Sequence, residues 1–268
     1  MSVSGLVAQA SDARPKQMSA EEWQARCDLA AAYQLIDLYG MSDLAVTHIS
    51  ARVPGEPSHF LFNPLGTLFD QITASSLIKV DVDGGLVEGD RRLLNPAGFV
   101  IHSAVYLAQP NLVCALHTHT PANNAVAGVK QGLMPLNQKS ASIQHVLRYH
   151  DYEGAAFDLD ERGRIARDLG GDGRILLLRN HGSLTVGESV AEAWSWHYLL
   201  EMACRYQVQT LTSVAGGAVL NPLSDHAVAL LREQSKKTLS STGALPIGFE
   251  WPSLLRKLER ERGTSYRS

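Results

Sequence analysis

The chain has 268 residues, 45% of them hydrophobic and 19% charged, which is enough apolar side chain for the core of one large domain or two small ones. Its formal net charge is −3 and it has no long basic stripe, so we expect no nucleic-acid partner. It also lacks a signal-like start and any apolar run long enough to span a bilayer, which predicts a cytoplasmic protein with no membrane partner.

The N-terminal segment and the first helix are predicted from local signals. Residues 1–18 are small and polar, so we expect a flexible arm. Ser19 is a predicted N-cap, with Glu21 and Glu22 in the first turn, where their charges complement the helix dipole. Apolar residues at helical spacing then continue to Gly40, a typical helix stop.

The rest of the chain alternates between strand and helix patterns. The pattern predicts strands over 46–49, 60–62, 77–80, 112–117 and 174–178, and helices over 99–107, 121–129, 189–212, 223–239 and 252–262. No repeat or change in composition divides the chain. We therefore predict one α/β domain over residues 19–268, ending in a helical C-terminal tail. The three cysteines, Cys27, Cys114 and Cys204, lie far apart in apolar contexts, which is typical of buried thiols in a reducing compartment.

Two histidines follow the apolar strand at 112–117. In an extended strand, residues i and i+2 point to the same face, roughly 6.5 to 7 Å apart, so His117 and His119 can lean toward one point. His181 ends the other strong apolar strand, and it can complete a set of three imidazoles if the two strands are near each other in one sheet. Three neutral ring nitrogens suit Zn²⁺ or a similar divalent ion. The competing interpretation is three histidines that each have a separate protein partner.

Four motifs in order make the chain resemble the class II aldolase/adducin family over roughly residues 20–215. They are FNPLGTLFDQITASSLIKVDVDG at 62–84, NPAGFVIH at 95–102, HTHTPA at 117–122 and LLLRNHG at 176–182. The resemblance implies a three-layer α/β/α fold with a central, mainly antiparallel sheet. It also implies a divalent metal on His117, His119 and His181, with Zn²⁺ preferred over Mn²⁺, Fe²⁺ or Co²⁺. A homotetramer with active sites at subunit interfaces is implied as well.

The chain departs from the sugar-phosphate aldolases of that family at the acid/base position. Those enzymes carry a glutamate nineteen residues before the first histidine of the pair, and here that position is Gly98. His102 keeps its place in the same motif, which argues against a shifted alignment. Glycine cannot move a proton, so we expect the acid or base to come from elsewhere in the protein.

The phosphate-binding positions also differ. The pairs that bind phosphate in those aldolases correspond here to Thr47-His48, Leu65-Gly66 and Pro96-Ala97, and a proline has no N–H to donate. We therefore expect the substrate-binding residues Thr47, His48, Gly66 and Gly98 to form a site that binds phosphate poorly. Thr47 and His48 remain suited to a carboxylate or a phenol.

Candidates for the missing acid or base come from two segments. Residues 144–154 are rich in titratable groups and resemble a variable segment near the site mouth of adducin-like members, which makes His150, Tyr152 and Glu153 candidates. A polar surface loop would have the same composition. Tyr266 is a fourth candidate, because some relatives take a proton from a C-terminal tyrosine of a neighbouring subunit; a frayed C-terminus is the alternative.

These observations favour a metal-dependent lyase that acts on a small, non-phosphorylated hydroxy- or oxo-acid. Aromatic acids are included in this substrate class. Retro-aldol cleavage and decarboxylation both pass through an enolate that a Lewis acid stabilises. A non-catalytic adducin-like assembly module is the alternative, and a sugar-phosphate aldolase is disfavoured by the altered phosphate positions.

Overall fold

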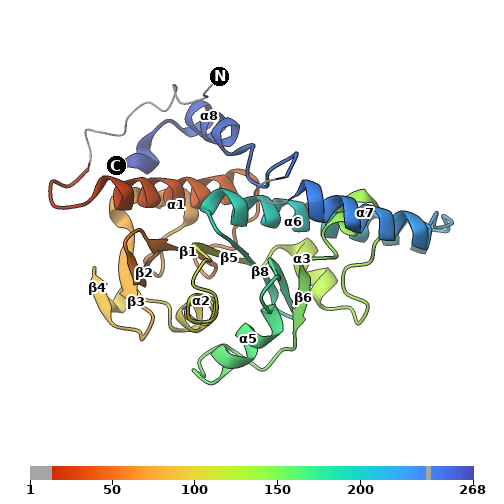
Figure 1. Cartoon of the computed structure of the whole chain (residues 1–268), viewed down its shortest axis with the longest axis horizontal. Helices are drawn as coiled ribbons and strands as arrows, with labels where there is room; N and C mark the ends of the chain where they lie inside the picture. The colour runs from red at the N-terminus through yellow and green to blue at the C-terminus, as the bar shows by residue number, and fades with distance from the viewer. Residues whose placement is uncertain (1–13, 240–242) are drawn as a thin grey trace.

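The computed structural model describes residues 14–239 and 243–268, which build an eight-stranded sheet flanked by helices (Figure 1). The strands follow the order β4-β3-β2-β1-β5-β8-β7-β6, and every neighbouring pair is antiparallel except β6 and β7. The strands are β1 His48–Val53, β2 Glu56–Phe62, β3 Ile78–Asp81, β4 Leu86–Glu88, β5 Cys114–Thr118, β6 Leu147–His150, β7 Ile175–Leu178 and β8 Gly182–Gly187. The expected mainly antiparallel sheet is confirmed.

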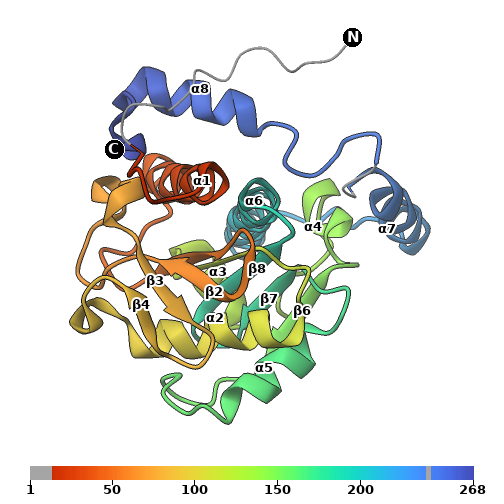
Figure 2. The same cartoon turned by 60° about the vertical axis from the view of Figure 1, so that its left-hand side comes forward.

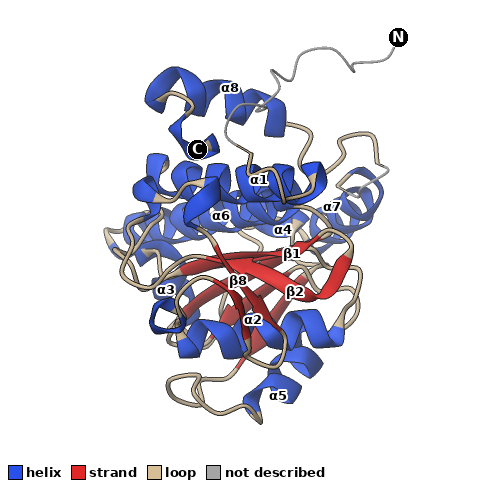
Figure 3. Cartoon of the chain, turned by 90° about the vertical axis from the view of Figure 1, so that its left-hand side faces the viewer, coloured by secondary structure: helices blue, strands red, loops and turns tan. Residues whose placement is uncertain are grey.

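Helices cover both faces of the sheet, which gives the three expected layers (Figure 3). Helices α1 and α6 lie on one face, and α2 and α5 lie on the other. The helices are α1 Ala20–Leu38, α2 Pro96–Ala108, α3 Pro121–Ala127, α4 Gln138–Ser142, α5 Glu161–Leu169, α6 Val190–Ala215, α7 Asp225–Thr238 and α8 Trp251–Arg262. Figure 2 shows α8 outside α1, with the C-terminus of the chain beside α1.

The predicted N-cap at Ser19 is confirmed, and the long helix α6 is capped in the same way. The side chain of Ser19 accepts a hydrogen bond from the backbone N–H of Glu22, and Ser189 caps α6 by accepting from Glu192. The helical C-terminal tail appears as α7 and α8. Most of the predicted N-terminal arm, residues 1–13, lies outside the described residues.

An apolar layer fills each side of the sheet. Trp194, Leu29 and Leu116 belong to the layer beneath α1 and α6, and Phe60 and Val100 belong to the layer that faces α2. All three cysteines are buried as free thiols, as predicted. None of the helices in the described residues combines the length and the apolar character needed to cross a bilayer.

Three strands were not predicted from the sequence: the short edge strand β4, and the strands β6 and β8. Strand β8 has the sequence GSLTVG, which is rich in small and polar residues and gives a weak strand signal. Strand β6 occupies residues 147–150, so the titratable segment at 144–154 begins in a turn, enters the sheet as a strand and becomes a loop again after His150.

Candidate metal centre

Strand β8 connects the two histidine-bearing segments. It lies between β5 and β7, where His117 pairs with Leu184 on β8. Strands β7 and β8 form a hairpin whose turn includes Asn180 at φ 58° and His181. Asparagine tolerates this left-handed backbone better than most residues. The hairpin therefore returns His181 to the end of the sheet where His117 and His119 lie.

The turn approaches β5 closely, and Gly182 makes this possible. A Cβ atom at Gly182 would lie 2.5 Å from the carbonyl oxygen of Thr118 and 2.9 Å from Cδ2 of His119. Two asparagines of α3 bind the turn from the other side. Asn124 Nδ2 donates to the carbonyl oxygen of His181 at 2.8 Å, and Asn123 Nδ2 donates to Ser183 Oγ at 2.9 Å. The asparagines of HTHTPANN thus fix the geometry between the two histidine segments.

The three imidazoles converge through their Nε2 atoms. The Nε2 atom of His119 is 2.8 Å from that of His117 and 3.0 Å from that of His181, and one ligand atom from each residue lies within 4.8 Å of the others. On the opposite edge of two rings, His117 Nδ1 faces the carbonyl oxygen of Ser183 at 2.9 Å, and His119 Nδ1 faces Asp43 Oδ2 at 3.2 Å. Outer partners of this kind fix the tautomer and turn the Nε2 lone pair toward an ion.

Burial keeps two of the three rings neutral. Desolvation lowers the pKa of His117 well below the ordinary value of 6.5, and the same cause, with the neighbouring His119 second, lowers the pKa of His181 to about 4. A neutral imidazole has a lone pair for a metal, whereas a protonated one does not. The donor set, the neutral state of His117 and His181, and the outer partners of His117 and His119 together fit a divalent ion.

His48 fills the space beside this centre. Its ring stacks on that of His117 with a centroid separation of 4.8 Å and an interplanar angle of 28°. Its Nδ1 lies 2.8 Å from Nε2 of His102, the last residue of the NPAGFVIH motif. A Cβ atom at Gly98 would lie 2.7 Å from Cδ2 of His48 and 2.8 Å from Cζ of Phe62. Position 98 therefore has no room for a glutamate while His48 stays where it is.

The other predicted substrate positions surround the same end of the sheet. Thr47 immediately precedes β1, and its buried Oγ1 has no hydrogen-bond partner in the described part of the chain. Gly66 has a φ of 86° in the loop after β2, with open space around it. At the start of α2, the backbone N–H groups of Ala97 and Gly98 donate to Asn95 Oδ1 at 3.1 and 3.3 Å. Because these two N–H groups already donate to Asn95, they are not available to bind a phosphate.

The candidates at 150–153 have different surroundings. Tyr152 is 57% exposed, and its ring centroid lies 6.3 Å from that of His181, which places a phenol at the mouth of the site. Glu153 pairs with Arg164 at 2.6 Å. His150 is buried, with its Nδ1 2.7 Å from Asp168 Oδ2. Of these three residues, Tyr152 is the one that combines a largely exposed side chain with a ring close to the candidate metal ligand His181.

Tyr266 lies elsewhere in this chain. It is buried in the apolar layer on the α1 side, and its hydroxyl donates to Glu259 Oε1 at 3.1 Å. The C-terminal residues are therefore not frayed, because Ser75 N also donates to the carbonyl oxygen of Ser268. The structure brings His48, His117, His119, His181 and Tyr152 together, and it places Tyr266 against α1.

Two residues near the centre were missed from the sequence. Asp43 reaches His119 from the loop after α1, and no motif in its neighbourhood indicates this. Arg179 lies beside His181 in the hairpin turn, with its guanidinium 4.1 Å from the centroid of Tyr149. The LLLRNHG motif contains this arginine, so the motif was the available signal.

Comparison with known proteins agrees with the fold and the motifs. The family profile described as "Class II Aldolase and Adducin N-terminal domain" matches residues 27–208. A crystal structure of an aldolase II superfamily protein from Pseudomonas syringae is 44% identical, with a TM-score of 0.85 over 94% of this chain and 98% of that chain. The L-fuculose 1-phosphate aldolase from Glaciozyma antarctica PI12 is 26% identical, with a TM-score of 0.78 over 95% of this chain and 97% of that chain.

The chain is also similar to adducins. Alpha-adducin from Rattus norvegicus is 47% identical over 193 residues. These residues are 71% of this chain but 26% of alpha-adducin, so the shared part is a minor portion of that longer protein.

Proposed function

The chain belongs to the class II aldolase and adducin family, and from this premise we propose that it is a metal-dependent lyase that cleaves a carbon–carbon bond. The substrate class we propose is a small, non-phosphorylated hydroxy- or oxo-acid, with aromatic acids included. The observation that carries the proposal is the convergence of three imidazole Nε2 atoms, two of them on rings oriented by Ser183 and Asp43.

We propose that His117, His119 and His181 hold the ion, and that Zn²⁺ is preferred over Mn²⁺, Fe²⁺ or Co²⁺ because three imidazoles leave a fourth position open. Bound there, a divalent ion would supply Lewis-acid stabilisation of an enolate. Retro-aldol cleavage and decarboxylation both leave an electron pair on carbon that must take up a proton. The Tyr152 hydroxyl at the site mouth is the candidate donor.

The argument against a phosphorylated substrate comes from this chain's own contacts. Asn95 already occupies the amides at the start of α2, Pro96 has no N–H, and His48 fills the space at position 98. We propose that the buried hydroxyl of Thr47 and the ring of His48 orient a carboxylate or phenol oxygen instead.

The test is turnover of a panel of hydroxy- and oxo-acids, aromatic ones included, by protein loaded with Zn²⁺ and by chelator-treated protein. We expect turnover only in the loaded sample, with CO₂ or an aldehyde identifying the reaction. The same panel should include sugar phosphates. Activity confined to sugar phosphates would contradict the proposed substrate class. Equal activity before and after chelation would contradict the proposed metal dependence.

A second candidate is a non-catalytic assembly module, favoured by the 47% identity to alpha-adducin and by the absence of a titratable side chain at Gly98. Metal content separates the two candidates. A gently purified chain with less than about a tenth of an equivalent of transition metal, and no turnover after loading, would favour the assembly module.

We also propose a cytoplasmic homotetramer with active sites at subunit interfaces and a small-molecule substrate. In such an assembly a Tyr266 from one subunit could serve its neighbour only after leaving its own α1. Light scattering of the purified protein tests the tetramer, and a monomer that retains full turnover would contradict it.

A further inference from the structure

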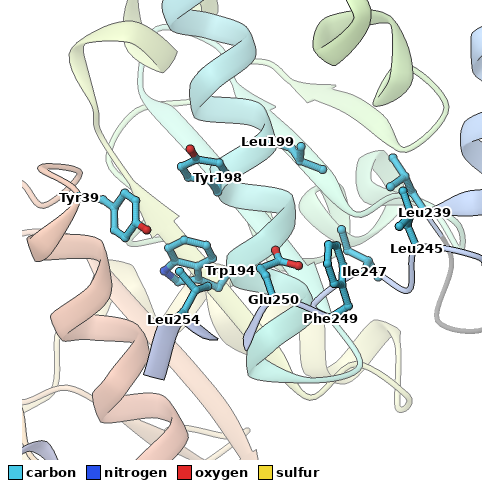
Figure 4. A pocket seen from close by; sticks show the side chains of 10 residues that line it. All are labelled: Tyr39, Trp194, Tyr198, Leu199, Leu239, Leu245, Ile247, Phe249, Glu250 and Leu254. Carbon is cyan, nitrogen blue, oxygen red and sulfur yellow. The ribbon is translucent and has the colours of Figure 1, made fainter. Parts of the chain in front are cut away.

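A cavity separate from the candidate metal centre lies between the end of α1, helix α6 and the segment that leads into α8 (Figure 4). Its volume is about 310 Å³, within the usual range for small-molecule sites. Tyr39, Trp194 and Tyr198 form one part of its wall, and leucines that include Leu199 and Leu254 form much of the rest. It shares no lining residue with the candidate metal centre, so it needs an explanation of its own.

The aromatic residues form a rigid group. The rings of Trp194 and Tyr198 are parallel within 7°, with centroids 5.5 Å apart. Tyr39 stands edge-on to both, at 5.5 Å from Trp194 and 5.7 Å from Tyr198. Aromatic faces carry partial negative charge and attract cations. Two lysines already use this property, with Lys257 Nζ 4.3 Å from the centroid of Tyr39 and Lys139 Nζ 6.0 Å from that of Tyr198.

Glu250 is the single charged residue in the wall that the described chain provides. Figure 4 shows its carboxylate beside Trp194 and Ile247. One carboxylate oxygen accepts a hydrogen bond from Ser195 Oγ, and the other has no partner in the described residues. The carboxylate is half-buried among apolar side chains, where a nearby cation gains more than it would in water. Lys139 and Lys257 do not line the cavity.

We propose that this cavity binds a small hydrophobic amine. Its ammonium group lies at Glu250, in the part of the wall that Trp194 and Tyr198 also line, and its apolar body lies along Leu199 and the neighbouring leucines. The carboxylate and the aromatic faces favour the same charge, so the site discriminates by charge as well as by apolar contact.

The experiment is calorimetric titration of the full chain with three probes of similar shape: hexylammonium, hexanol and hexanoate. We expect hexylammonium to bind at least tenfold more tightly than either of the other two. Tighter binding of hexanoate would show that Lys139 and Lys257 dominate the cavity, and it would overturn the proposal. Failure of all three probes to bind would also overturn it.

Two variants locate the site. Glu250→Gln keeps an acceptor for Ser195 but removes the charge, so we expect it to weaken hexylammonium at least fivefold and leave hexanol unchanged. Glu261→Gln, at a carboxylate on α8 outside the cavity wall, is the matched control and should change neither. Leu199→Trp should weaken hexylammonium and hexanol by filling the cavity. Unchanged hexylammonium affinity in Glu250→Gln, or unchanged binding in Leu199→Trp, would refute the site.

Discussion

The imidazole of His48 occupies the volume that a side chain at position 98 would need, with Cδ2 2.7 Å and Nε2 2.9 Å from the place of a Gly98 Cβ. The two residues come from β1 and α2 and are 50 positions apart in the sequence. The ring of His48 also stacks on that of His117. A change at either position therefore acts on the other and on the candidate metal centre.

Gly98→Ala should destabilise the protein by about 1–3 kcal/mol, because the added methyl group forces His48 and Phe62 to move. Chemical denaturation measures the change. In the double variant with His48→Ala, the added cost of Gly98→Ala should fall, because only the contact with Phe62 then remains. Gly163→Ala, at an exposed helical glycine with open space around it, is the control and should stabilise by about 0.5–1 kcal/mol. Equal costs of Gly98→Ala with and without His48 would refute the steric link.

His117→Ala should abolish metal binding and activity while leaving the fold assembled, because the ring contributes one of three Nε2 donors. Elemental analysis measures the metal and circular dichroism the fold. His226→Ala, on the exposed part of α7, should leave the metal content unchanged. Global unfolding of the His117 variant would point to a structural role for the histidine.

Asp43→Asn should reduce metal affinity by about 10–100-fold, because the amide is a weaker acceptor for His119 Nδ1 than the carboxylate and carries no charge. Competition with a chromophoric chelator measures the affinity. Asp70→Asn alters an exposed aspartate outside the centre and serves as the control. If the Asp43 and Asp70 variants bind metal equally well, the carboxylate has no part in the centre.

Tyr152→Phe and Tyr266→Phe should behave differently. Loss of the Tyr152 hydroxyl at the site mouth should reduce kcat at least tenfold with little change in stability. Loss of the Tyr266 hydroxyl removes a hydrogen bond to Glu259 and should cost about 0.5–1.5 kcal/mol of stability. Steady-state kinetics measure kcat and chemical denaturation measures the unfolding free energy of both variants. The reverse result, a kcat defect confined to Tyr266→Phe, would assign the proton donor to the C-terminus.

The metal-free protein should lose stability as the pH falls from 7.5 to 5. Burial lowers the pKa of His197 to about 3 and that of His181 to about 4, against an ordinary value of 6.5. The unfolded chain therefore takes up protons first, and below about pH 6.5 each such histidine costs roughly 1.4 kcal/mol per pH unit until its folded pKa is reached. Urea titrations at several pH values measure this. A constant unfolding free energy over this range would contradict buried, neutral histidines.

Much of the fold could be predicted because its signals are local. Ser19 and Ser189 cap their helices through hydrogen bonds that span three residues, and a capping motif of this length is visible in any sequence. The spacing of His117 and His119 on a strand end is local in the same sense. The prediction of the third ligand, His181, depended on the family motif, because no residue near His181 specifies which strand lies beside it in the sheet.

The tertiary structure alone decided which residues meet. Strand β8 was invisible to the hydrophobic pattern, yet it separates β5 from β7 and returns His181 to the histidine pair. The contact of Asp43 with His119 and the filling of position 98 by His48 join residues 76 and 50 positions apart. Periodicity and capping act within a few residues, whereas such contacts depend on the order of strands in the sheet and on how side chains share the space between them.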